Sequence, residues 1–132
     1  VQTCALPILI QRPGAWVHVF TGQRMDHMPL ANPALICGIA RPQRFERLVR
    51  QQGVDISRTV FYPDHHDFCA AEIEENETID EKGGVTTHKD AVRIAALPFR
   101  RLPELYYLEM KLGFVSEEDE NLFSSLLDRI KQ

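Results

Sequence analysis

From residue 34 onward, short apolar runs alternate with segments of helical pattern, and this alternation restricts the possible folds more than any other feature. The strand-like runs are rich in aliphatic, β-branched or aromatic residues, and the segments between them have helical spacing. The expected strands are residues 34–40, 56–62, 83–87 and 105–114, and the expected helical segments are residues 41–53, 67–77, 89–94 and 116–132. Such alternation favours right-handed βαβ units. The sequence therefore predicts an α/β fold with a mostly parallel sheet and flanking helices.

Two of the helices also have recognisable ends. Pro42 stands in the first turn of the helix expected at 41–53, and Gly53 is a stop signal. Ser116 and Asp119 have the spacing of a capping box at the start of the last helix. That helix carries one apolar stripe, formed by Leu122, Phe123, Leu126, Leu127 and Ile130.

Length and composition predict one soluble domain. A chain of 132 residues with 44% hydrophobic and 26% charged residues can form an ordinary globular core. The net charge of -4 argues against a nucleic-acid-binding domain, which would carry a basic face. Cys4, Cys37 and Cys69 are widely spaced and odd in number, so neither a disulfide framework nor a zinc ribbon is indicated. The longest apolar run, residues 4–10, is too short to span a bilayer and contains a proline.

The first 33 residues lie outside the regular alternation. Residues 1–10 have no initiator Met and no capping signal, and they read either as a fragment edge of partly non-native sequence or as an ordinary first strand. Residues 16–20 are compatible with a strand. We therefore treat 1–33 as a separate N-terminal segment of uncertain origin.

Two loops at one predicted sheet edge carry the candidate functional residues. In open α/β sheets, ligands bind beyond the carboxyl ends of the strands, where the loops converge. The loop "PDHHDF" follows one strand and "TTHKD" follows the next; together they bring Asp64, His65, His66, Thr87, His88, Lys89 and Asp90 to this edge. An Asp–His pair can tune an imidazole near neutral pH, and an adjacent lysine can hold a phosphate.

Each of these residues also has a purely structural interpretation. Asp64 or Asp67 has the type and place of a helix cap, and Thr87 with Asp90 has the spacing of a capping box. Arg41, Arg44, Arg47 and Arg50 follow one another at intervals of three. This row is either a solvated helix face or a contact for phosphate groups or an anionic membrane surface.

At these residues the sequence resembles a known family. The segments "ICGIARPQRFERLVRQQG", "FYPDHHDF" and "VTTHKDAVRI" are similar, in order and spacing, to the C-terminal part of the tetraacyldisaccharide 4'-kinases, the lipid A 4'-kinases of Gram-negative bacteria. The family's corresponding motifs read approximately GIA/GIG-x-P-x-x-F, DH and TEKDAV. The resemblance covers residues 34–94 in its motifs and extends to the C-terminus in its element order.

The resemblance implies a fold and an activity. Family members consist of a P-loop domain followed by a smaller Rossmann-like domain, which residues 34–132 would form here. They transfer the γ-phosphate of ATP to the 4'-hydroxyl of tetraacyldisaccharide 1-phosphate, at the cytoplasmic face of the inner membrane, in lipid A biosynthesis. The expected partners are the lipid A disaccharide precursor, a peripheral membrane contact and the P-loop domain, with no nucleic acid.

The resemblance also implies roles for individual residues. His65 matches the family's catalytic histidine, which pairs with an Asp of the P-loop domain to activate the sugar hydroxyl, and Asp64 would orient its imidazole or cap the helix. Thr87, Lys89 and Asp90 match the TEKD motif and would bind or position the substrate. Arg44 is a further candidate for this role, because it belongs to the arginine row and not because it matches a family motif. His88 stands where the family usually has Glu, so no role is predicted for it.

Phosphoryl transfer needs a phosphate-binding loop of the type GxxxxGK[ST] and a magnesium site, and the 132 residues contain no such loop. We therefore expect a C-terminal fragment that is inactive by itself, with ATP and Mg²⁺ bound mainly by a missing N-terminal domain. Two alternatives stay open: a DHH-type metal-dependent phosphoesterase, and a non-catalytic α/β module that binds a sugar phosphate through the arginine row.

Overall fold

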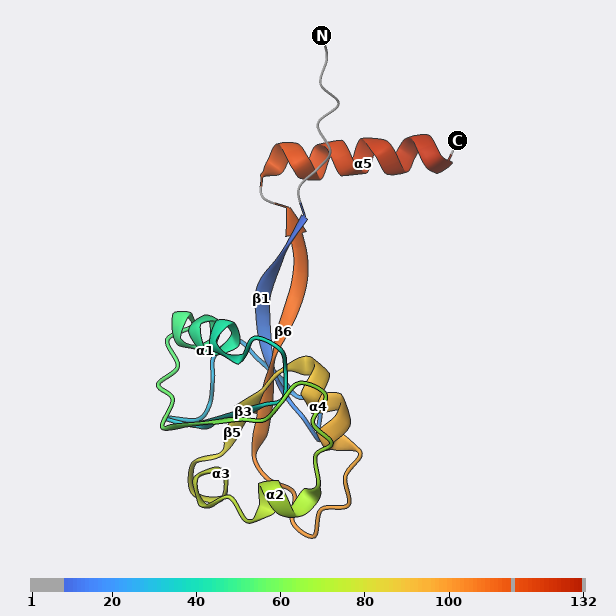
Figure 1. Ribbon diagram of the computed structural model, residues 1–132. Coiled ribbons are helices and arrows are strands. Elements are labelled where there is room, and N and C mark those ends of the chain that lie inside the picture. Colours follow the sequence, from blue (N-terminus) through green and yellow to red (C-terminus); the bar gives the residue numbers. More distant parts are fainter. Residues whose placement is uncertain (1–8, 115, 132) are drawn as a thin grey trace. The chain divides into compact units, whose positions relative to one another are not determined.

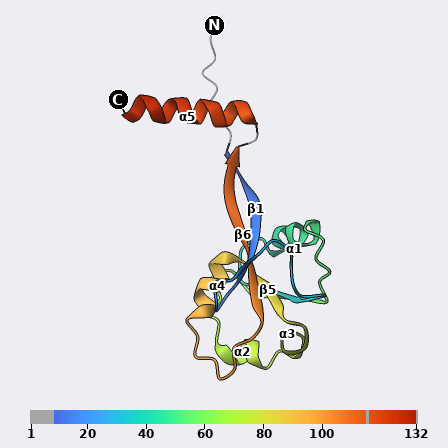
Figure 2. The ribbon, with the colours of Figure 1, turned by 180° about the vertical axis from the view of Figure 1, so that it is seen from behind.

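The computed structural model describes residues 9–114 and 116–131, which form a six-stranded sheet with flanking helices (Figures 1 and 2). The strands are β1 (Leu9–His18), β2 (Arg24–Met25), β3 (Ala34–Cys37), β4 (Arg58–Phe61), β5 (Gly84–Thr86) and β6 (Leu105–Phe114). The helices are α1 (Pro42–Gln51), α2 (Ala70–Glu74), α3 (Glu77–Lys82), α4 (His88–Ala95) and α5 (Glu117–Lys131). The predicted α/β class is thus confirmed.

The strand order is β2-β1-β6-β5-β3-β4, and its central part is parallel. β3 pairs in parallel with β4 and β5, and β5 pairs in parallel with β6. β1 runs antiparallel to β2. β1 is also antiparallel to its other neighbour β6, because the Val19 amide bonds to the Leu105 carbonyl whereas Arg12 bonds to the carbonyl of Phe114. The sheet is therefore mixed, with the predicted parallel strands on one side.

The described chain divides into two compact units. One contains the described ends of the chain, up to Pro13 and from Met110 onward, and the other is Gly14–Glu109. In the first, the outer halves of β1 and β6 form a two-stranded ribbon, and Phe123 of α5 packs on Phe114 with ring centroids 5.3 Å apart. The second unit contains the hydrophobic core and all of the candidate site residues.

The core of the larger unit is mostly aliphatic. All four residues of β3 are buried, as expected for a strand that lies between two parallel neighbours. The central cluster contains Ala34, Ile36, Phe68, Ile73, Ile79, Ile94 and Leu105. Each of the isoleucine, leucine and phenylalanine side chains contributes about 1.5–3 kcal/mol through removal of its apolar surface from water. Helix α1 adds Phe45 and Val49, at the helical spacing predicted from the sequence.

Several elements differ from their predicted extents. The acidic segment expected to be helical at 67–77 forms two short helices, because Asn76 caps α3 by accepting a hydrogen bond from the Ile79 amide. Neither Asp64 nor Asp67 caps α2, whose N-cap residue is Cys69. The first strand covers Leu9–His18, a longer and earlier segment than residues 16–20. Residues 1–8 of the N-terminal segment lie outside the described part of the chain.

Gly83, the C-cap residue between α3 and β5, has a conformation that requires glycine. Its φ is +75°, and a Cβ there would lie 2.5 Å from the side chain of Leu30 and 3.0 Å from the carbonyl oxygen of Glu104. Glycine therefore allows the chain to turn tightly into the parallel strand that leads to the candidate site.

Candidate active site

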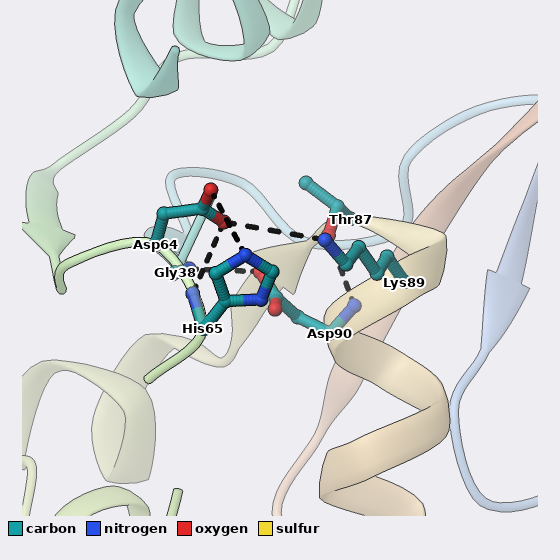
Figure 3. Close-up of polar contacts among 6 residues, drawn as sticks. All are labelled: Gly38, Asp64, His65, Thr87, Lys89 and Asp90. Carbon is teal, nitrogen blue, oxygen red and sulfur yellow. Dashed lines mark hydrogen bonds and ion pairs between the residues drawn. The ribbon is translucent and has the colours of Figure 1, made fainter. Parts of the chain in front are cut away.

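The loops that carry the predicted residues emerge at one edge of the sheet. β3 and β4 pair in register as far as Cys37 and Phe61, and β5 runs parallel to β3, so their carboxyl ends share an edge. Figure 3 shows the residues that meet there: Gly38, Asp64, His65, Thr87, Lys89 and Asp90. This is the edge where α/β proteins bind their ligands.

Asp64 and His65 form the exposed part of the site. Asp64 Oδ1 accepts a hydrogen bond from the backbone amide of His65 at 3.0 Å, and Asp64 Oδ2 lies 3.5 Å from His65 Nε2. The His65 side chain is 75% exposed. Its backbone φ is +64°, a left-handed conformation that costs a residue other than glycine roughly 1–2 kcal/mol. The loop thus presents an exposed imidazole with a carboxylate beside it.

Lys89 adds a cation to the same group. It lies in the first turn of α4, and its Nζ is 4.0 Å from Asp64 Oδ1. Its side chain is 53% exposed. The charge is therefore partly balanced by Asp64 and remains accessible to an anion such as a phosphate group.

Asp90 and Thr87 act on the backbone of this site. Asp90 is fully buried, and its Oδ2 accepts a hydrogen bond from the Gly38 amide at 2.8 Å. Asp90 Oδ1 and Thr86 Oγ1 have no hydrogen-bond partner among the described residues. Thr87 is the N-cap of α4, since its Oγ1 accepts from the Asp90 amide at 3.1 Å. Asp90 therefore connects α4 to the loop after β3. The prediction that Thr87 caps the helix is confirmed.

Arg44 lies in the first turn of α1 and is exposed, as are the other arginines of the row, Arg41, Arg47 and Arg50. Arg50 forms an ion pair with Glu46 at 3.2 Å. The guanidinium of Arg44 has no ion-pair partner among the residues that the structure describes. No described contact joins Arg44 to the Asp64–His65 loop.

The two other histidines of these loops are packed against aromatic rings. His88 stacks on Tyr107, with ring centroids 4.6 Å apart and an interplanar angle of 5°. His66 Nε2 lies 2.8 Å from Glu72 Oε2, and its ring stacks on Tyr62. Neither presents a free ring in the way that His65 does.

Sequence reasoning did not identify two residues that shape the site. Gly38 donates its backbone amide to Asp90. The feature of the sequence that could have identified Gly38 is its position directly after the apolar run at 34–37. Glu72 holds both His66 and the Cys69 amide, and its signal was its position three residues after a helix start.

Cys37, at the end of β3, is not a nucleophile candidate. Burial, followed by the charges of Asp90 and Glu46, raises the pKa of its thiol to about 12. The thiolate form is therefore negligible near neutral pH.

The described residues provide neither a metal site nor a membrane span. Within 9–114 and 116–131, no three His, Cys, Asp or Glu side chains are grouped so that they could hold a metal ion. The acidic residues of the site are engaged, Asp64 with His65 and Lys89, and Asp90 with Gly38. Over the same residues, no helix has both the length and the apolar character needed to cross a bilayer.

Fold and site together define a Rossmann-like α/β domain that presents an Asp–His pair and a lysine at the carboxyl edge of its parallel strands. The fold is similar to the crystal structure of the "apo" form of LpxK from Aquifex aeolicus in complex with ATP, with a TM-score of 0.64 over 92% of this chain and 35% of that one, at 16% identity. The family model described as tetraacyldisaccharide-1-P 4'-kinase matches residues 8–131, so the chain belongs to this family.

Curated relatives agree with this family membership. The tetraacyldisaccharide 4'-kinase of Rhodopseudomonas palustris (strain BisB5) is 38% identical over 98 residues, which cover 72% of this chain and 28% of the relative. The enzyme of the same name from Gluconobacter oxydans is 31% identical over 101 residues, which cover 74% of this chain and 28% of that relative. The chain thus spans less than a third of the length of these relatives.

Proposed function

We propose that this chain is the C-terminal part of a kinase that transfers the γ-phosphate of ATP to the 4'-hydroxyl of tetraacyldisaccharide 1-phosphate in lipid A biosynthesis. The observation that carries the proposal is the exposed Asp64–His65 pair, with Lys89 beside it, in a member of this family. A general acid or base needs an accessible ring, a second group to orient it, and a place where a ligand can approach. His65 satisfies all three conditions.

In the proposed mechanism, His65 and an aspartate of the nucleotide-binding part together remove the proton of the 4'-hydroxyl. The hydroxyl oxygen attacks the γ-phosphorus of ATP, and the bond to the bridging oxygen breaks, so that ADP leaves with the bonding electrons. Asp64 faces Nε2 of the imidazole and orients the ring. Proton removal is only part of the catalysis, because phosphoryl transfer depends mostly on positioning and on charge stabilisation.

The remaining candidate residues act on the substrate or on the shape of the site. Lys89 and Arg44 are exposed cations suited to the anionic groups of the substrate. Thr87 and Asp90 act through the backbone, because they fix the start of α4 and the position of Gly38. This division is consistent with the complete burial of Asp90, which keeps its carboxylate away from any ligand.

ATP and Mg²⁺ are assigned to a preceding P-loop domain of a longer protein. This part of the proposal is supported by the share of the relatives that the chain covers, 28% for each of the two described above. It is also supported by apolar side chains left exposed in the unit that contains α5, namely Leu9, Ile10, Leu112, Leu127 and Ile130. We infer that the preceding domain covers them.

The proposed location is the cytoplasmic face of the inner membrane of a Gram-negative bacterium. An acylated disaccharide stays in the bilayer, so the enzyme must meet it at the membrane surface through a peripheral contact. The complete protein is expected to distribute between the membrane and soluble fractions, with release from the membrane by salt.

The test of the proposed function is a transfer assay on the complete protein that carries this chain, with γ-³²P-labelled ATP and tetraacyldisaccharide 1-phosphate in detergent micelles. His65→Ala should lower kcat by about 10²- to 10⁴-fold, the usual contribution of general acid–base catalysis. The matched control is His27→Ala, an exposed histidine before β3 and hence outside the candidate edge, which should leave kcat unchanged.

The 132-residue chain without its preceding part should give no labelled product. Transfer by this chain alone would refute the assignment of ATP to a separate domain. Full activity of the His65→Ala enzyme would refute the assigned role of the histidine.

A further inference from the structure

His66, the second histidine of the loop, is fixed from several sides. Its Nε2 lies 2.8 Å from Glu72 Oε2. Its ring stacks on Tyr62 with centroids 4.1 Å apart and an interplanar angle of 11°, and it meets Phe68 edge-on at 4.8 Å. Only 23% of its side chain is exposed, against 75% for His65. The two neighbouring histidines therefore have opposite environments.

The turn between Tyr62 and His66 explains why such an anchor matters. The His66 amide donates to the Pro63 carbonyl at 3.1 Å, which closes a four-residue turn with His65 in its third position. His65 has φ +64°, a value that the third position of a type II turn requires and that glycine or asparagine adopts far more readily than histidine. Contacts on both sides of the turn must therefore offset this unfavourable conformation.

Both sides of the turn are in fact held. Before it, the Tyr62 amide bonds to the Cys37 carbonyl at 2.9 Å, which extends the pairing of β4 with β3. After the turn, His66 is bonded to Glu72, and its ring packs on Tyr62. The His66 ring thus connects the residue that precedes the turn with the residue that ends it. Glu72 is in turn fixed in α2, where its other oxygen accepts from the Cys69 amide at 2.9 Å.

The anchored loop also lies directly against Gly38. A Cβ at Gly38 would stand 3.1 Å from the Cβ of His66 and 3.3 Å from both the Phe68 ring and the Pro63 carbonyl oxygen. The Gly38 amide is itself bound by Asp90, at the start of the helix that carries Lys89. His66 therefore occupies the point where the His65 turn and the α4 side of the site are packed together.

We propose that His66, bonded to Glu72 and stacked on Tyr62, is a positioning residue that holds the His65 turn in its left-handed conformation and so fixes the imidazole for phosphoryl transfer. This inference rests on the function proposed above. His66 does not touch the substrate; it acts through the turn. Because a misplacement of about 1 Å can cost a factor of about 100 in rate, loss of the anchor should affect turnover rather than binding.

The experiment measures kcat and KM of the complete enzyme for the disaccharide, together with amide hydrogen exchange in the peptide that contains residues 62–68. His66→Ala should lower kcat by about tenfold or more with KM changed less than about twofold, and the loop amides should exchange faster. His66→Gln places an amide donor near Glu72 and should recover part of kcat. Asn76→Ala, which removes the cap of α3 without touching the loop, is the control for general destabilisation.

The outcomes separate this inference from the proposed function. If the wild-type enzyme transfers phosphate and both His66 variants match it in kcat, the positioning role is refuted while the kinase function stands. A kcat that falls equally in His66→Ala and Asn76→Ala also refutes it, since the loss would then reflect stability alone. If the wild-type enzyme transfers no phosphate, the kinase function fails and the positioning role fails with it.

Discussion

At the scale of single residues, the candidate site retains an unfavourable backbone conformation at His65, and this should be visible as a stability cost. His65→Asn places a residue at φ +64° that adopts the left-handed region more readily, so we expect the free energy of unfolding to rise by about 1 kcal/mol. Urea unfolding measures this change. Asp67→Asn, an exposed position in the same loop, should leave the midpoint unchanged. A His65→Asn protein no more stable than wild type would show that the turn is not strained.

A second residue-scale prediction concerns the pH dependence of stability through Glu72. Burial alone would raise the pKa of this carboxyl, but hydrogen bonds from Cys69 and His66 outweigh it and bring the pKa below its ordinary value of 4.5. A carboxyl whose pKa is depressed in the folded state stabilises the protein above its unfolded-state pKa, and the contribution is lost as pH falls through the folded value.

The stability of the wild type should therefore decline below about pH 4.5 more steeply than that of Glu72→Gln. Thermal unfolding from pH 3 to 7 compares the two proteins. Glu75→Gln, an exposed residue at the end of the same helix, serves as control and should follow the wild type. Parallel curves for wild type and Glu72→Gln would contradict the prediction.

At the scale of elements, mutation of the caps of two helices can distinguish an effect on stability from an effect on function. Thr87 caps α4 at the candidate site, and Asn76 caps α3, which precedes β5. Replacement of either by alanine removes one bond to a helix amide and should cost about 1 kcal/mol of unfolding free energy. Only Thr87→Ala should also lower the transfer rate of the complete enzyme, because α4 carries Lys89 and Asp90 into the site. Equal transfer rates for Thr87→Ala and Asn76→Ala would show that Thr87 has no role in the reaction. Thr87→Ser keeps the capping hydroxyl and should behave like the wild type.

At the scale of the whole molecule, the proposal that a preceding domain covers the exposed end of the α5 stripe can be tested by mutation. Ile130 is 79% exposed in the structure, although it belongs to the same stripe as Phe123, which packs on Phe114. Ile130→Asp should leave the stability of the 132-residue chain nearly unchanged and lower the melting temperature of the complete protein. Arg129→Ala, the adjacent exposed position, is the control. An equal effect of Ile130→Asp on both proteins would refute the covered-surface proposal.

Much of the fold was predictable from local patterns in the sequence. The strand at 105–114 has the predicted bounds, and the Thr87 cap and the last helix follow from residue type and spacing. The division of residues 70–82 into two helices was missed, although Asn76 is a good cap, because the acidic residues continue on both sides of Asn76 and neither glycine nor proline marks the break. The antiparallel pairing of β1 with β6 was also out of reach, since the two strands lie nearly the whole chain length apart.

The sequence by itself determined the fold class and the sheet edge at which the Asp64–His65 loop and the start of α4 emerge, because both depend on periodicity and strand direction. Only the tertiary structure distinguished the roles of similar residues at that edge. His65 is exposed and His66 anchored, and Lys89 is accessible whereas Asp90 is buried against Gly38. Neighbouring residues in a loop or helix turn point in different directions, and the partners that fix each one come from segments distant in the sequence. Such partners can be identified only once the chain has folded.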